Sequence, residues 1–123
     1  MPTLAQDTYA LRIAPTGKFS LIEWGHDMCP QSALGADQVR SVDITTQLIM
    51  WTDGLAVLLG RPANNPARHL LRAFQTVPAQ VCGTAVFTGS THGGTLLGLT
   101  EDQALALLDR YMNRRRAIPG PRR

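Results

Sequence analysis

The sequence predicts an α+β fold in which a small, mostly antiparallel sheet carries two helices on one face. Short apolar segments over residues 9–24 and 42–59, separated by turn residues, are typical of strands joined in hairpins. Start signals and apolar stripes predict helices over residues 65–76 and 101–115. Between them, residues 81–89 have apolar or small side chains at nearly every position, as expected of a central strand.

The chain is expected to begin with a β-hairpin. In residues 9–14, Tyr9, Leu11 and Ile13 alternate with smaller or polar side chains, which is the period of a half-buried strand. The turn at 15–18 contains Pro and Gly, and residues 19–24 resume the strand pattern.

The next segments are less regular. Residues 25–35 contain Pro30 and two glycines and are interpreted as a loop, and residues 36–40 as a single helical turn at most. Residues 42–44 are β-branched and short. Two apolar runs, 48–51 and 55–59, then flank Thr52-Asp53-Gly54, and Asp-Gly between apolar runs favours a hairpin. A buried helix over 48–59 is the alternative, with Gly54 costing it about 1 kcal/mol relative to alanine.

The first long helix is predicted to begin at Asn65 as N-cap, with Pro66 in the first helical position. Its apolar stripe falls at i, i+3, i+4 and i+7, and Pro78 prevents its continuation. The stripe residues are Ala67, Leu70, Leu71 and Phe74.

The second long helix is predicted to begin with a capping box, Thr100 with Gln103, followed by acidic residues that suit the helix dipole. Its expected buried stripe consists of Ala104, Leu105, Leu108, Tyr111 and Met112.

These motifs, in this order, resemble a small family of unknown function found in phages, plasmids and their bacterial hosts. The resemblance rests on the segments 64–68 (Asn-Asn-Pro-Ala-Arg), 83–89 (Gly-Thr-Ala-Val-Phe-Thr-Gly) and 97–101 (Leu-Gly-Leu-Thr-Glu). It covers mainly residues 64–111 and implies an α+β fold and a mobile-element setting. It implies no catalytic residues.

Charge divides the chain into a body and a tail. Residues 1–109 carry six basic and nine acidic side chains, whereas residues 110–123 carry six arginines and no acid. We therefore expect a single domain over 1–113 and a basic, disordered tail over 114–123. The arginines are Arg110, Arg114, Arg115, Arg116, Arg122 and Arg123. They suit phosphate contacts with nucleic acid, or they serve only solubility and the helix dipole.

Two further clusters bear on chemistry. His26 and Cys29 are two potential zinc ligands, but no second closely spaced pair supplies the rest of a site, so a polar loop is the simpler interpretation. The loop Ser90-Thr91-His92-Gly93-Gly94 follows a strand, where exposed backbone N–H groups can hold an anion. It lacks a phosphate-binding glycine pattern, and the acidic turn that follows disfavours phosphate.

Composition sets the remaining expectations. The chain has no apolar run of the roughly 20 residues that span a bilayer and no signal-peptide pattern, so we expect a cytoplasmic protein without a membrane partner. Its two cysteines do not form a disulfide framework. No signature of catalysis or of a cofactor is present.

The favoured hypothesis is therefore a non-enzymatic accessory protein of a phage or mobile element that binds a host protein. Its partner surface, or a surface for self-association into a homo-oligomer, is expected on the sheet, where apolar residues exceed what two helices can cover. The alternative is a nucleic-acid-binding protein that uses the C-terminal arginines. A third hypothesis is a small-ligand binder or enzyme that uses His92 and its glycine loop.

Overall fold

The computed structural model describes residues 8–25, 27–74, 80–92 and 95–117, with the backbone alone for residue 92 and residues 114–117. The fold is α+β, as the sequence predicts. A six-stranded antiparallel sheet has the order β2-β1-β5-β4-β3, and β8 pairs with β1 beside β5. A separate two-stranded ribbon, β6 with β7, completes the strands.

The sheet strands are β1 (Thr8–Ile13), β2 (Phe19–Glu23), β3 (Val39–Thr45), β4 (Leu48–Asp53), β5 (Ala85–Thr88) and β8 (Leu99–Thr100). The ribbon strands are β6 (Thr91–His92) and β7 (Thr95–Leu96), and the helices are α1 (Pro30–Leu34), α2 (Asn65–Arg72) and α3 (Glu101–Ala117).

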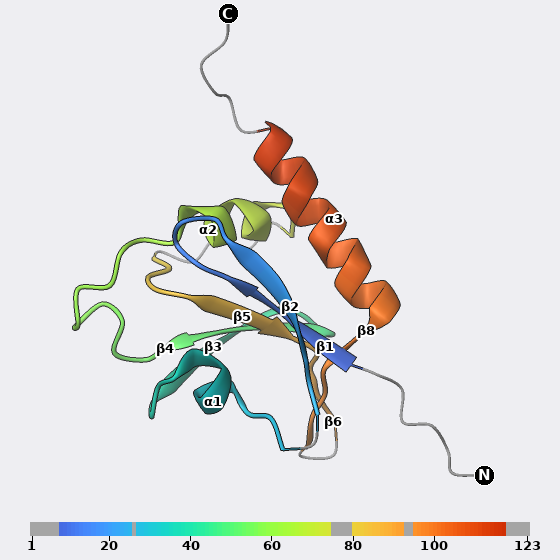
Figure 1. Cartoon of the computed structure of the whole chain (residues 1–123), viewed down its shortest axis with the longest axis horizontal. Coiled ribbons are helices and arrows are strands. Elements are labelled where there is room, and N and C mark those ends of the chain that lie inside the picture. The colour runs from blue at the N-terminus through green and yellow to red at the C-terminus, as the bar shows by residue number, and fades with distance from the viewer. Residues whose placement is uncertain (1–7, 26, 75–79, 93–94, 118–123) are drawn as a thin grey trace, which may run out of the picture.

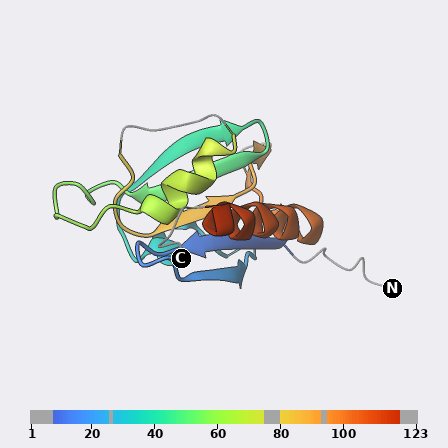
Figure 2. The same cartoon turned by 90° about the horizontal axis from the view of Figure 1, so that it is seen from above.

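The two longer helices cover one face of the sheet, and α1 lies on the other (Figures 1 and 2). The main core fills the space under α2 and α3, where Leu11, Phe87, Leu70, Leu71 and Tyr111 are completely buried. Full burial of each such side chain contributes roughly 1.5–3 kcal/mol. Helix packing on this face therefore provides most of the apolar burial.

A second, smaller cluster covers the opposite face. Ala10, Trp24 and Val86 are buried there, and side chains from α1 and β7 pack against them, including Leu34 and Leu96. The chain itself thus covers apolar surface that the two long helices leave open.

The first hairpin is confirmed, with Leu11 opposite Leu21. The interpretation of 25–35 as loop is wrong in part, because Pro30 stands at the start of α1 and Gly35 ends it in the left-handed conformation (φ 63°). Residues 36–40 form no helical turn; Val39 and Arg40 already belong to β3.

The predicted hairpin about Asp53-Gly54 is also wrong. The hairpin partner of β4 is β3, with Val42 opposite Met50, and the turn between them contains Thr46 and Gln47. Gly54 does not adopt the positive φ that a two-residue Asp-Gly turn requires. Residues 55–59 consequently form neither a strand nor a continuous helix with 48–53.

The N-cap of α2 is Asn64 rather than Asn65. The Oδ1 atom of Asn64 accepts the N–H of Ala67 at 3.0 Å, and its Nδ2 donates to Ile13 O (2.9 Å) and Gly83 O (2.8 Å). The helix ends at Arg72, four residues short of the predicted end, while Pro78 lies outside the described residues.

The central position of residues 81–89 is confirmed, since β5 is fully buried between β1 and β4. The strand itself is shorter than predicted. Cys82 forms an isolated bridge with Ala63, and Gly83 adopts a positive φ of 75°. This bend redirects the chain before β5 begins.

The second long helix is confirmed together with its capping box, in which Thr100 N–H donates to Gln103 Oε1 at 2.9 Å. The predicted stripe is wrong at one position, because Leu105 is 52% exposed while Leu107 is buried. Packing against β1 and α2 selects a helical face rotated from the one that the apolar pattern alone indicates. No helix in the described ranges is both long and apolar enough to cross a membrane.

Candidate functional site

An exposed apolar loop follows β4 and projects from the body of the protein between β4 and α2 (Figure 1). We call residues 55–59 (Leu-Ala-Val-Leu-Leu) the apolar loop. Leu58 is 82% exposed, Val57 58% and Leu59 55%, whereas Ala56 is buried. Exposed apolar side chains gathered in this way are typical of an interaction site.

The apolar loop is held in one conformation by hydrogen bonds. Leu59 N–H donates to Leu55 O at 2.8 Å, forming a single helical turn, and Leu55 N–H donates to Asp53 Oδ1 at 2.9 Å. The turn ends in a Schellman motif: Arg61 N–H bonds Ala56 O (2.9 Å), Gly60 N–H bonds Val57 O (3.1 Å), and Gly60 has φ 69°. The exposed leucines are therefore presented by an ordered backbone.

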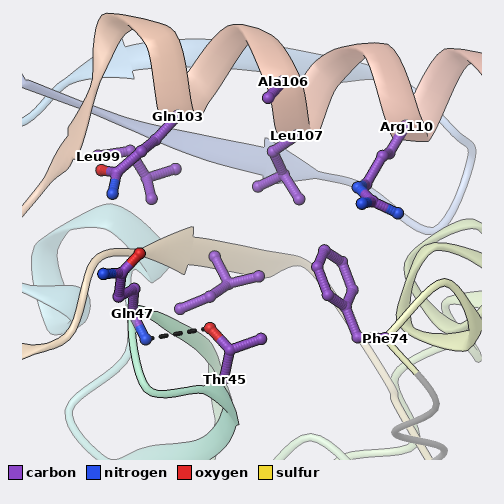
Figure 3. A pocket seen from close by; sticks show the side chains of 9 residues that line it. Thr45, Gln47, Phe74, Leu99, Gln103, Ala106, Leu107 and Arg110 are labelled. Atoms are coloured by element: carbon purple, nitrogen blue, oxygen red, sulfur yellow. Dashed lines mark hydrogen bonds between the residues drawn. The ribbon is translucent and has the colours of Figure 1, made fainter.

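A groove of about 180 Å³ lies between α3 and the turn that joins β3 to β4, and we call it the α3 groove (Figure 3). Its apolar lining comes from β4, β8, α3 and the residues after α2. The apolar lining residues are Leu48, Phe74, Leu99, Ala106 and Leu107.

Polar side chains stand at the two ends of the α3 groove. Figure 3 shows Gln103 and Gln47 near one end and Arg110 beside Phe74 at the other. The guanidinium carbon of Arg110 lies 5.2 Å from the centre of the Phe74 ring, within the range of a cation–π contact. From one end to the other, the α3 groove thus offers two carboxamides, an apolar floor and a cation.

The predicted basic residues are only partly described. Arg110 is exposed on α3, and the helical backbone continues through Arg114, Arg115 and Arg116 to Ala117. Arg122 and Arg123 lie outside the described residues. Arg68 and Arg72 of α2 lie in the same helical layer as Arg110, and Arg68 Nε is buried without a hydrogen-bond partner among the described residues.

The predicted ligand loop is described only in part. Ser90 precedes β6, and Thr91 and His92 form that strand, in which His92 pairs with Thr95. Gly93 and Gly94 lie outside the described residues, as does the His92 side chain. A ligand at this loop stays a prediction.

Of the two weak metal candidates, His26 lies outside the described residues and Cys29 is the N-cap of α1. Hydrogen bonding with the Ser32 side chain lowers the pKa of the exposed Cys29 thiol. Within the described part of the chain, no group of three or more His, Cys, Asp or Glu side chains is arranged to hold a metal. Cys82 is a buried free thiol.

Sequence reasoning missed both surfaces. The sequence predicts a strand for the apolar loop because five apolar residues follow one another. The available signal against a strand is Gly60 after them, the residue type that commonly ends a helical turn. The α3 groove has no sequence signal, because its lining comes from three separate segments of the chain, residues 45–48, Phe74 and residues 99–110.

Comparison with known families gives one match. Residues 8–114 match the family model described as a domain of unknown function (DUF3846). No curated protein and no solved structure matches the chain. The family match includes the first hairpin and β3–β4, and so extends well beyond the resemblance over residues 64–111.

Proposed function

The chain belongs to the DUF3846 family, a family of unknown function, and we propose that it is a non-enzymatic accessory protein that binds a protein partner through the apolar loop. The observation that carries this proposal is the exposure of Leu58, Val57 and Leu59 on an ordered turn. Burying such side chains is favourable in proportion to the apolar area removed from water. An ordered loop also loses little conformational entropy on binding.

The size of the apolar loop favours a concave partner over simple self-association. Its exposed side chains offer roughly 400 Å² of surface, about half of what each partner contributes to a standard interface. Two copies meeting tip to tip would bury too little area for a stable dimer. A groove that encloses the loop adds contacts on its flanks, where Asp53 and Arg61 stand.

We further propose that the partner is a protein of the bacterial host and that this chain originates from a phage or another mobile element. The sequence resemblance over residues 64–111 supports this setting. A small domain that presents one apolar loop suits a role in which it occupies a groove of a larger host protein.

The test compares two exposed leucines. Leu58→Asp places a charge on the apolar loop, and Leu105→Asp makes the same change at a 52% exposed leucine on α3. Tagged wild type and both variants are used for affinity purification from host lysate with nuclease present, and the recovered partner is then titrated in purified form. We expect Leu58→Asp to weaken binding by at least about 100-fold, as for a central interface residue, and Leu105→Asp to leave it unchanged.

Equal binding by wild type and Leu58→Asp would refute this role of the loop. Circular dichroism melting of both variants serves as the folding control. Recovery of no specific protein by the wild type would also count against the proposal.

A second candidate function is nucleic-acid binding, favoured by one observation: α2 and α3 bring Arg68, Arg72 and Arg110 into one layer, and α3 continues through three further arginines. Phosphate contacts from these side chains would release counterions, so binding would weaken steeply with salt. Truncation after Met112 removes five of the arginines and should then strongly weaken salt-sensitive retention of DNA or RNA. Retention that this truncation leaves unchanged would argue against the arginine-rich C-terminus.

A further inference from the structure

The α3 groove lies at the opposite end of β4 from the apolar loop. The groove is lined by Thr45, Gln47 and Leu48 at the start of β4, whereas the loop follows Asp53 at its end. Six strand residues separate the two surfaces by roughly 18 Å. The groove is therefore a separate site that substitutions in the loop leave intact.

The floor of the α3 groove suits one apolar side chain. Leu99, Leu107 and Leu48 are almost fully buried beneath it, and Ala106 leaves room above them because its side chain ends at Cβ. An apolar cavity of about 150 Å³ holds a benzene-sized group, so the groove, at about 180 Å³, matches a leucine or phenylalanine side chain. It is too small for a long acyl chain.

Arg110 gives the groove a charge preference at one end. Its guanidinium lies over the Phe74 ring, and no carboxylate among the described residues forms an ion pair with it. Asp109, its neighbour in sequence, accepts a hydrogen bond from Asn113 Nδ2 instead. A guanidinium in a cation–π contact still has N–H groups that can donate to a carboxylate, in the best case to both of its oxygens.

The other end of the groove suits backbone amides. Gln103 uses Oε1 to accept from Thr100 N–H, which leaves its Nε2 group to donate. Gln47 adds a second carboxamide on the opposite wall (Figure 3). Gln103 and Arg110 are seven residues apart on α3, so roughly 10 Å of helix separates them, about the span of three extended residues.

We infer that the α3 groove binds a short extended segment of a partner protein, with one large apolar side chain on the groove floor and a carboxylate beside it on Arg110. The inference rests on the proposed function as a protein-binding module and assigns it a second contact. A partner that enclosed the apolar loop and supplied such a segment would gain affinity from both ends of β4.

The experiment is an NMR titration of the full ¹⁵N-labelled chain with a capped tetrapeptide of sequence leucine–glycine–aspartate–glycine, because side chains two residues apart lie on the same side of an extended segment. Matched probes replace the aspartate with asparagine or the leucine with alanine. We expect saturable shifts confined to the groove residues, including Gln103 and Arg110, and at least about tenfold weaker binding of each matched probe.

Three variants make the test specific. Arg110→Gln should weaken binding of the aspartate peptide by about tenfold, so that this peptide no longer binds more tightly than the asparagine peptide. Arg12→Gln, at an exposed arginine of β1 outside both proposed surfaces, should leave both affinities unchanged. Ala106→Leu, at an exposed helical position, should block the floor and abolish binding while the spectrum elsewhere stays native.

A failure of the α3 groove to bind the peptide is distinguishable from a failure of the apolar loop to bind the protein partner. Leu58→Asp should bind the tetrapeptide as wild type does, whatever it does to the full partner. Equal affinities for the aspartate and asparagine peptides, or no effect of Arg110→Gln, would overturn the inference. Hexanoate binding as tightly as the peptide would reassign the groove to small carboxylates.

Discussion

Replacing Asn64 with alanine removes the side chain that joins three separate parts of the fold. Asn64 is completely buried. Its Nδ2 donates to Ile13 O at the end of β1 and to Gly83 O before β5, and its Oδ1 caps α2 through Ala67 N–H. No other residue in the described ranges makes this set of contacts.

The magnitude follows from these three bonds. The loss of each bond leaves a buried backbone group without its side-chain partner, which costs roughly 1–3 kcal/mol per group when no water replaces the side chain. Loss of the helix cap alone costs about 1 kcal/mol. Allowing for partial relaxation, we expect Asn64→Ala to reduce the free energy of unfolding by about 3–5 kcal/mol. That is a large share of the roughly 5–15 kcal/mol typical of a domain.

The assay is urea unfolding monitored by tryptophan fluorescence, because Trp24 is buried and Trp51 donates to Thr88 Oγ1 at 2.9 Å. The control is Asn65→Ala, since Asn65 is exposed and its replacement should change stability by less than about 0.5 kcal/mol. If the two variants unfold at the same urea concentration, the assigned role of Asn64 is refuted.

Asn64→Asp tests the donors separately from the cap. The carboxylate keeps the acceptor for Ala67 but faces two carbonyl oxygens, so its native pKa should rise above its unfolded value of about 3.9. The native state then binds more protons than the unfolded state above that pH, and stability should fall as pH increases, by up to about 1.4 kcal/mol per pH unit. Wild type should show no such loss between pH 4 and 6.

Three further predictions concern packing, a tertiary hydrogen bond and a thiol. Gly98→Ala should cost about 1–3 kcal/mol, because the added Cβ would lie 2.7 Å from a side chain of β1; Gly54→Ala, where the nearest atom is 3.4 Å away, should cost less than about 1 kcal/mol in the same unfolding assay. Tyr111→Phe removes a 2.7 Å hydrogen bond from α3 to the β1–β2 turn and should cost about 1 kcal/mol while leaving the ring packed; an unchanged unfolding midpoint would contradict this. Ser32→Ala should raise the pKa of the Cys29 thiol toward its usual value, and so move the midpoint of the iodoacetamide labelling rate to higher pH; an identical pH profile would show that Ser32 has no such effect.

The elements predicted best are those specified by local chemistry. The first hairpin, the capping box at Thr100 and the buried central position of β5 depend on turn residues, caps and alternation that lie within a few residues of each other. The errors arise where residues that are distant in the chain but close in space determine the local conformation. Asn64 and Asn65 are equal candidates for the cap by sequence, and only Ile13 and Gly83, distant in the chain, select Asn64.

The sequence by itself determined the α+β class, the two long helices and the apolar character of residues 55–59. Only the tertiary structure decided that four of these five residues are exposed and Ala56 is buried, because a run of apolar residues carries no information about whether another segment covers it. The same holds for the α3 groove. Its floor, carboxamides and arginine come from segments as far apart as Thr45 and Arg110, and they form one surface only when α3 packs beside the β3–β4 turn.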